Sequence, residues 1–195
     1  LFPYTTLFRS TKSYNKTRGM LISEPEIWNR LMEKLADMSI EYLSMQARAG
    51  ANALQIFDSW VGAVNSTEYE QAIFPHMKRI ISTVKSRFPN LPLAMNGVGT
   101  DHLISTWAKL PLDVIALDWR SSLGAANDRG VTQTVQGNLD PAYLYGDTKT
   151  IAKVVDEILM DGVRHGKHVF NLGHGVFPEA DPAKLHWLTD YVHEK

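Results

Sequence analysis

The chain has 195 residues, 44% of them hydrophobic and 21% charged, a composition typical of one globular domain with a buried core. Its net charge of -1 provides no basic field that would attract nucleic acid or an anionic membrane, so we expect neither as a partner. The chain contains no cysteine, which excludes disulfides, thiolate nucleophiles and cysteine-based zinc sites within it. No apolar run reaches the roughly 18 to 20 residues that span a bilayer, and no signal peptide is visible, so we expect a cytoplasmic location.

The first ten residues, LFPYTTLFRS, have neither a helical nor a strand pattern. Their back-translation resembles a common sequencing adapter, so we expect that residues 1–10 do not belong to the natural gene. Residues 11–195 are then the natural part, and we expect that it begins in the middle of a longer protein. Intact genomic DNA that encodes this peptide in frame would contradict that expectation.

A long helix is predicted to begin at Pro25, because its acidic neighbours suit the positive helix end, and to stop at Gly50. Apolar residues recur in it every three or four positions and predict one buried face; they are Ile27, Leu31, Leu35, Met38 and Tyr42. Further helices are expected at residues 68–88, 101–109, 121–128, 148–162 and 182–193. The buried face of the helix at 68–88 is expected to comprise Ile73, Met77, Ile80, Ile81 and Val84.

Five short apolar runs alternate with these helices and predict strands; they lie at residues 53–58, 91–95, 114–117, 134–135 and 167–170. Strands that alternate with helices form a parallel sheet with right-handed crossovers, so we expect an α/β fold. A polar cluster follows each run; the clusters are Asp58-Ser59, Asn96-Gly97, Asp118-Trp119-Arg120, Gln136-Asn138 and Asn171-His174. Parallel sheets bind ligands at the carboxyl edge of their strands, so these clusters predict a site there.

Several local motifs favour ordinary structural roles. The glycines of residues 97–102 could cradle phosphate, but the third glycine of that pattern is missing, so we favour a tight turn. Ser59 lacks the Gly-X-Ser-X-Gly elbow of a hydrolase. His165 and His168 lie in a basic loop, where we expect solvated side chains rather than a cation site. No spacing of His174 with the strand-end aspartates supports a metal site, so we expect no metal.

The strand ends together resemble the uroporphyrinogen decarboxylase family, on motifs that recur in the family's order; they are GANALQIFDSW at 50–60, LDW at 117–119, VQGNLDP at 135–141 and FNLGHG at 170–175. The resemblance covers residues 11–195 and implies a (β/α)8 TIM barrel of about 250 residues. This chain would supply roughly the last five of its eight units, so its barrel would not close. The family acts as a homodimer without a cofactor. It removes carbon dioxide from the four acetate side chains of uroporphyrinogen III, which gives coproporphyrinogen III.

Carried over to this sequence, the resemblance implies that Ser59 bonds a substrate carboxylate, that His174 contacts the acidic side chains of the macrocycle, and that Phe57 lines the cleft. Such residues suit a polyanion with apolar pyrrole faces. Arg120 could reach a further carboxylate, although a structural ion pair is the favoured alternative. The family's arginine-rich loop, catalytic aspartate and tyrosine precede the first matched position, so we expect no catalytic residue within this chain. For Asp118-Trp119 we favour a packed, hydrogen-bonded strand end.

Two other functions stay open. A corrinoid-linked methyltransferase shares the barrel but activates a thiol through zinc held by cysteine, which this chain lacks. Metal analysis of the full-length protein would separate the two enzymes. A tetrapyrrole-binding protein without catalysis would also need Phe57, Ser59 and His174, but not the aspartate that stabilises a cationic intermediate.

An open barrel leaves both edge strands unpaired. We therefore predict that the 195-residue polypeptide alone aggregates readily and does not decarboxylate uroporphyrinogen, whereas the full-length protein does. Incubation of the purified chain with uroporphyrinogen, followed by chromatography of the products, tests this. Coproporphyrinogen made by the chain alone would contradict the prediction.

Overall fold

The computed structural model describes residues 14–195, so the segment 1–10 predicted to be foreign lies outside the described residues. The core of the fold is a five-stranded parallel sheet with the strands in sequential order. They are β1 (Leu54–Asp58), β2 (Leu93–Gly97), β3 (Val114–Ala116), β4 (Thr134–Leu139) and β5 (His168–Leu172). The predicted α/β fold is therefore confirmed. Within the described residues the sheet is not closed, and β1 and β5 are its edges.

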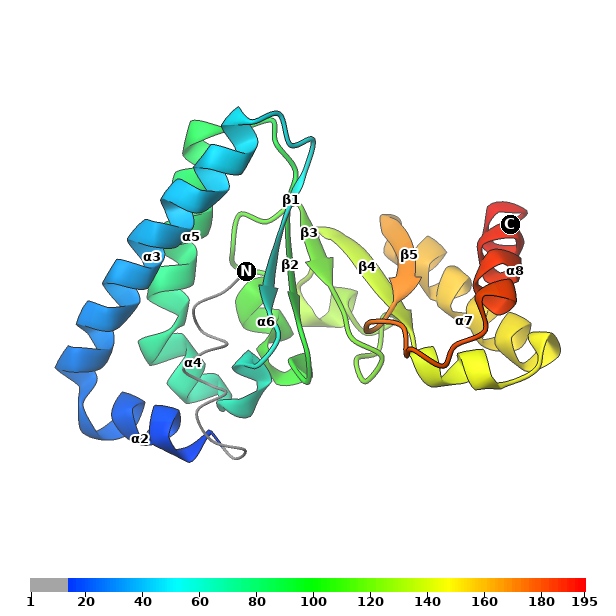
Figure 1. The fold of residues 1–195 in the computed structure, drawn as a ribbon, viewed down its shortest axis with the longest axis horizontal. Helices are drawn as coiled ribbons and strands as arrows, with labels where there is room; N and C mark the ends of the chain where they lie inside the picture. Colours follow the sequence, from blue (N-terminus) through cyan, green and yellow to red (C-terminus); the bar gives the residue numbers. More distant parts are fainter. Residues whose placement is uncertain (1–13) are drawn as a thin grey trace.

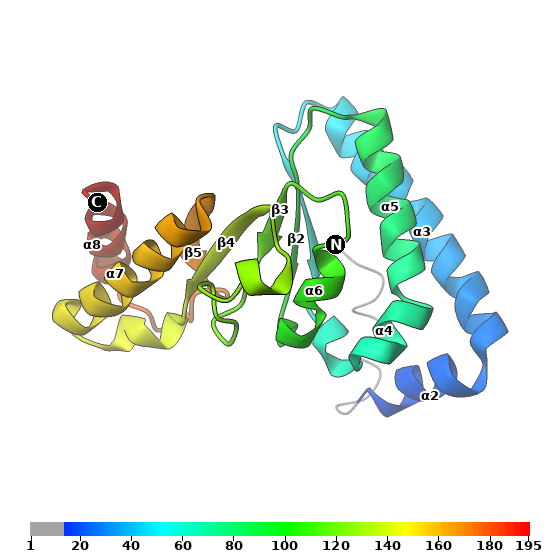
Figure 2. The same ribbon diagram turned by 180° about the vertical axis from the view of Figure 1, so that it is seen from behind.

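Helices connect the strands and lie on one face of the sheet. Figures 1 and 2 show α6 and α7 behind the sheet in one view and in front of it in the other. The α-helices are α2 (Asn15–Ser23), α3 (Pro25–Arg48), α4 (Ser66–Ala72), α5 (Phe74–Arg87), α6 (Ile104–Trp107), α7 (Thr148–His165) and α8 (Pro182–His193). Short 3-10 helices are η1 (Val61–Ala63), η2 (Asp101–Leu103), η3 (Asn127–Arg129) and η4 (Pro141–Tyr145).

The second face of the sheet is open. One residue from each strand lies in a single row across it, in the pairing register of the sheet: Phe57, Asn96, Ala116, Gln136 and Val169. At the two ends of the row, Phe57 and Val169 are each 48% exposed. The alternate residues of β1 point the other way, where Leu54 and Ile56 are buried in the core. The open face would be the interior of a barrel if further strands closed the sheet.

Helix α3 buries a different face from the predicted one. Its buried residues are Trp28, Met32, Ala36, Ser39, Ile40, Leu43 and Ser44. Of the predicted stripe, Ile27, Met38 and Tyr42 are exposed, so that prediction was wrong for them. The helix carries two apolar stripes about 100° apart, because successive residues turn by that angle. Contacts with α5 decide between them, and the Trp28 indole Nε1 also donates to the carbonyl of Ala72 at 2.9 Å.

The helix predicted at 68–88 is present as two helices, α4 and α5, that meet at Ile73. Pro75 has no N–H to donate and its ring disturbs the preceding turn, so it lies in the first turn of α5. All five apolar residues predicted to be buried there are buried. The helix predicted at 121–128 was wrong, because that segment is a loop that ends in η3.

The two histidines of the basic loop are not solvated as predicted. His165 Nε2 lies 2.7 Å from the carbonyl of Gln133, and His168 Nε2 lies 2.6 Å from the carbonyl of Gly137. Both acceptors belong to β4 or to the residue before it, so the histidines tie α7 and β5 to β4. The His168 ring occupies the space of a side chain at Gly162, where a Cβ would lie 2.2 Å from Nδ1.

A matched pair of methionines tests which face of α3 is buried. Met32 is 0% exposed and Met38 is 50% exposed. Met32→Ala should lower the free energy of unfolding by about 2–4 kcal/mol, because it removes buried apolar volume. Met38→Ala should change it by less than about 0.5 kcal/mol. Urea unfolding of both variants measures the two free energies of unfolding. Equal losses in the two variants would contradict the assignment of the buried face.

Candidate functional site

The carboxyl ends of all five strands lie at one edge of the sheet, because every pairing is parallel. Ser59 follows β1 directly and is half-buried, while His174 lies in the loop after β5 and is exposed. Phe57 lies on the open face of β1, one residue before its end. The structure thus brings these predicted residues to the same edge, as the sequence predicted. That they line one cavity stays a prediction.

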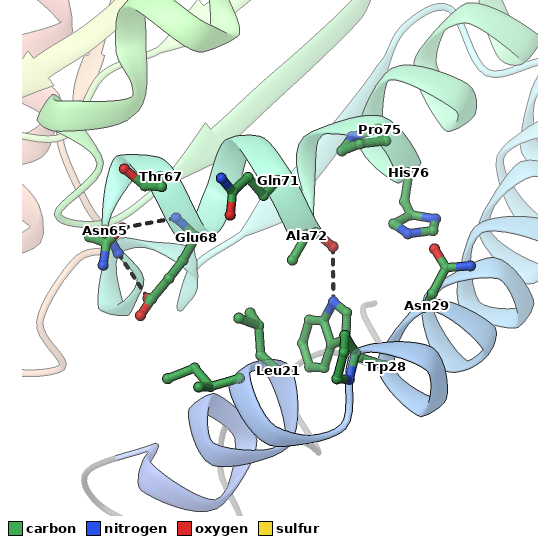
Figure 3. A pocket seen from close by; sticks show the side chains of 12 residues that line it. Leu21, Trp28, Asn29, Asn65, Thr67, Glu68, Gln71, Ala72, Pro75 and His76 are labelled. Atoms are coloured by element: carbon green, nitrogen blue, oxygen red, sulfur yellow. Dashed lines mark hydrogen bonds between the residues drawn. The ribbon is translucent and has the colours of Figure 1, made fainter.

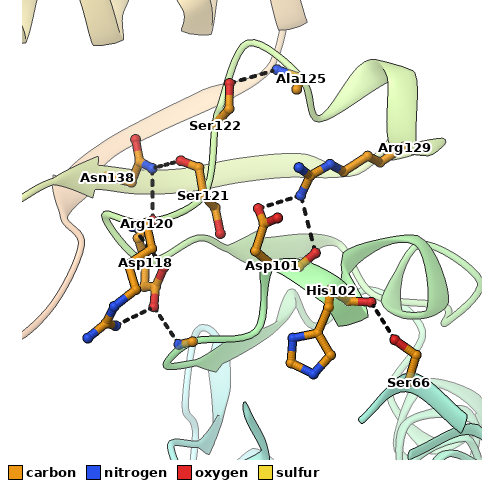
Figure 4. Close-up of polar contacts among 11 residues, drawn as sticks. Ser66, Asp101, His102, Asp118, Arg120, Ser121, Ser122, Ala125, Arg129 and Asn138 are labelled. Carbon is orange, nitrogen blue, oxygen red and sulfur yellow. Dashed lines mark hydrogen bonds and ion pairs between the residues drawn. The ribbon is translucent and has the colours of Figure 1, made fainter.

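Asp118 is the central buried group of this edge. Its side chain is 0% exposed and accepts hydrogen bonds from the backbone N–H of Gly99 and of Arg120. The Arg120 guanidinium adds an ion pair, with Nη1 3.0 Å from Oδ2 (Figure 4). A buried carboxylate requires such donors to offset its lost hydration. The predicted structural role of Asp118 and the favoured ion pair of Arg120 are therefore confirmed.

Asn138, at the end of β4, holds the same loop from the other side. Its side-chain Nδ2 donates to the carbonyls of Asp118 at 2.9 Å and of Ser121 at 2.7 Å (Figure 4). Asn138 is itself buried, so these bonds are shielded from water. Its polar position at a strand end was predicted from the sequence, but its function here is to anchor the backbone after β3.

Trp119 connects the two halves of the candidate site. Its ring meets the His174 ring edge-on, with centroids 5.6 Å apart and planes at 89°. The Arg120 guanidinium lies over the Trp119 ring, 3.7 Å from its centroid. Gly173 packs against the Trp119 backbone so closely that a Cβ would lie 2.4 Å from its nitrogen. Sequence reasoning did not predict this contact, and the glycine before His174 was its only signal.

The glycine-rich turn after β2 packs closely against neighbouring backbone, and this is the structural role that the sequence favoured. Gly62 approaches it closely, since a Cβ there would lie 2.3 Å from the Val98 carbonyl oxygen. Gly99 has a φ of 67°, which favours glycine, and its N–H already donates to Asp118. That donor is therefore not available to bind a phosphate.

Asp58 is the second buried aspartate of this edge, and its environment differs from that of Asp118. It shares the helix-facing side of β1 with Leu54 and Ile56 and is 4% exposed. Burial raises the pKa of the Asp58 carboxyl from 3.8 to about 7, because within residues 14–195 no charge or hydrogen bond compensates the lost hydration. Asp58 therefore faces away from the open face that carries Phe57.

A separate pocket of about 490 Å³ lies among helices α2 to α5 (Figure 3). Its lining includes Trp28, Glu68 and His76. Asn65 and Glu68 bond each other's backbone in a capping box at the start of α4. The lining contains none of the predicted site residues. This pocket is therefore distinct from the edge that carries Ser59 and His174.

Comparison with known proteins gives the family. The sequence matches the family model described as uroporphyrinogen decarboxylase (URO-D) over residues 3–195. The chain belongs to the uroporphyrinogen decarboxylase family. It is 50% identical over 184 residues to the uroporphyrinogen decarboxylase of Bacillus subtilis strain 168, covering 94% of this chain and 52% of that protein. The corresponding protein of Oceanobacillus iheyensis is 51% identical over 183 residues, again 94% of this chain and 52% of its relative.

This uroporphyrinogen decarboxylase family chain thus spans about half the length of the curated relatives it matches. A methyltransferase from Methanosarcina mazei has a similar structure, with a TM-score of 0.79 at 16% identity over 99% of this chain and 56% of that one. This likeness shows the fold, which is that of a TIM barrel whose sheet is open here. Among residues 14–195, no helix is long and apolar enough to cross a membrane.

The pKa of Asp58 predicts a pH dependence of stability. A carboxyl whose pKa is raised by folding destabilises the fold as it ionises, so its penalty is absent below about pH 3.8 and complete above about pH 7. Between these values the free energy of unfolding should fall by about 1.4 kcal/mol per pH unit from this group. Asp58→Asn should remove that component.

Urea unfolding of the wild type and Asp58→Asn at several values between pH 5 and pH 7 measures the difference. Asp128→Asn changes an exposed aspartate and is the matched control, which should keep the slope of the wild type. A slope in Asp58→Asn equal to that of the wild type would contradict the assignment.

Proposed function

We propose that the full-length protein decarboxylates the four acetate side chains of uroporphyrinogen III to give coproporphyrinogen III, in heme biosynthesis. The observation that carries this proposal is the identity of about half of all aligned residues with proteins named uroporphyrinogen decarboxylase. The position of the matched motifs at one edge of the sheet supports it, because barrels carry their active sites there.

Within this function, Ser59 and His174 bind carboxylates of the substrate and Phe57 packs against its pyrrole rings. A hydroxyl and an imidazole are suitable donors to carboxylates, and an aromatic ring suits the apolar faces of the macrocycle. Their places at the ends of β1 and β5 and on the open face support these assignments. The substrate would then lie across the carboxyl edge of the sheet.

Decarboxylation leaves an electron pair on the departing carbon, and a protonated pyrrole ring can accept it. A carboxylate beside that ring stabilises its positive charge. Asp118 does not serve, because its oxygens already accept from Gly99 and Arg120. Asp58 does not serve either, because it faces the helices. We therefore assign the catalytic aspartate, the tyrosine and the arginine-rich loop to a part of the full-length protein outside this chain.

The same proposal includes a homodimer that acts in the cytoplasm without a cofactor. The structural similarity to a methyltransferase does not favour methyl transfer, because 16% identity shows the fold alone. The sequence relatives at about 50% identity are named as decarboxylases, which favours decarboxylation.

Substitution of the proposed binding residues tests the function in the full-length protein. Ser59→Ala and His174→Gln should each lower kcat/KM for uroporphyrinogen about 10- to 100-fold, since each removes a hydrogen bond to a charged group worth about 1.5–3 kcal/mol. The exposed Ser86 and His186 provide matched controls, Ser86→Ala and His186→Gln, which should retain activity. A wild-type protein that forms no coproporphyrinogen would refute the proposed function. An unchanged kcat/KM in Ser59→Ala or His174→Gln would refute the binding role of that residue.

A further inference from the structure

The side chain of Arg120 has donors that its ion pair does not use. In the described part of the chain, only Nη1 among its guanidinium nitrogens donates to another residue, Asp118. A guanidinium carries five N–H groups in one plane, and the Arg120 side chain is 50% exposed. Trp119 covers one face of that plane, and within residues 14–195 no further acceptor bonds the remaining guanidinium N–H groups.

His174 and Arg120 share one neighbour, Trp119. The Trp119 ring contacts the Arg120 guanidinium with its face and the His174 ring at right angles. The Gly173 contact with the Trp119 backbone and a 2.7 Å bond from Gly173 N–H to the carbonyl of Leu139 fix the loop that carries His174. The loop after β5 thus reaches past the end of β4 to the loop after β3.

We propose that Arg120 and His174 form a carboxylate-binding pair, held in place by Trp119 and Asp118, that takes one carboxylate side chain of the tetrapyrrole. The proposal rests on the proposed function for the identity of its ligand. Asp118 balances the charge of Arg120, so the site offers oriented donors rather than a strong field. A planar guanidinium fork matches the two oxygens of a carboxylate, which a lysine ammonium does not.

Arg120→Met in the full-length protein tests the pair, because it removes the donors and keeps much of the length of the side chain. It should raise KM for uroporphyrinogen about 10- to 100-fold and change kcat little, since the lost contact exists before and during the reaction. Arg120→Lys should raise KM by a smaller factor, as a charge remains without the fork. Arg164→Met, on the exposed surface of α7, is the control and should leave KM unchanged.

The loss of Arg120 also leaves the buried Asp118 without its ion pair, which could lower stability. The double variant Asp118→Asn with Arg120→Met removes that unpaired charge. It should recover the melting temperature but not the KM. If Arg120 has only a structural role, Arg120→Met should lower the melting temperature and the amount of active protein at an unchanged KM, and that result would overturn the proposal.

Binding of uroporphyrin, the stable oxidised macrocycle, separates this proposal from the proposed function. Fluorescence titration should show weaker binding by Arg120→Met than by the wild type. Binding that depends on Arg120 in a protein without decarboxylase activity would support the pair and refute the function. Normal decarboxylation with an unchanged KM in Arg120→Met would support the proposed function and refute the carboxylate-binding pair. A wild type that neither forms coproporphyrinogen nor binds uroporphyrin would refute both.

Discussion

The buried carboxylate of Asp118 is the constraint on which the candidate site depends. It accepts hydrogen bonds from Gly99 in the loop after β2 and from Arg120 in its own loop, so one side chain joins two neighbouring strand ends. Asn138 links the end of β4 to the same loop, because its side chain donates to the Asp118 carbonyl. A charge without water must keep its donors, so these loops have little freedom to move apart. Trp119, the next residue, is therefore presented in a fixed position to His174.

Much of this edge could be predicted from the sequence, because parallel strands place all their carboxyl ends together. The polar clusters after each strand, including Asp58-Ser59 and Asn171-His174, therefore predicted the correct edge. What joins them could not be predicted, since it depends on contacts between residues far apart in the chain. The approach of Gly173 to Trp119 and the bonds of His165 and His168 to backbone carbonyls of the neighbouring strand are such contacts.

Helix α3 shows why periodicity alone can mislead. Two apolar stripes satisfy the same spacing, one through Met32 and one through Met38, and only the packing against α5 selects the first. Of the second stripe, Ile27, Met38 and Tyr42 stay exposed in the described part of the chain. The apolar pattern around Pro75 continues without a gap, although the helix is interrupted there. The proline itself marks the end of one helix and the start of the next.

Asp58 and Asp118 are chemically identical and nearly equally buried, yet among the described residues donors that offset burial are present only at Asp118. The uncompensated carboxyl, the open edge of the sheet and the exposed stripe all belong to β1 or to α3 directly before it. The other edge, at β5, has no comparable buried charge among the described residues. The curated relatives are longer, since this chain spans about half of their length. The cost of ionising a buried carboxyl without donors therefore falls on Asp58 and not on Asp118, and it destabilises the edge strand that carries Asp58.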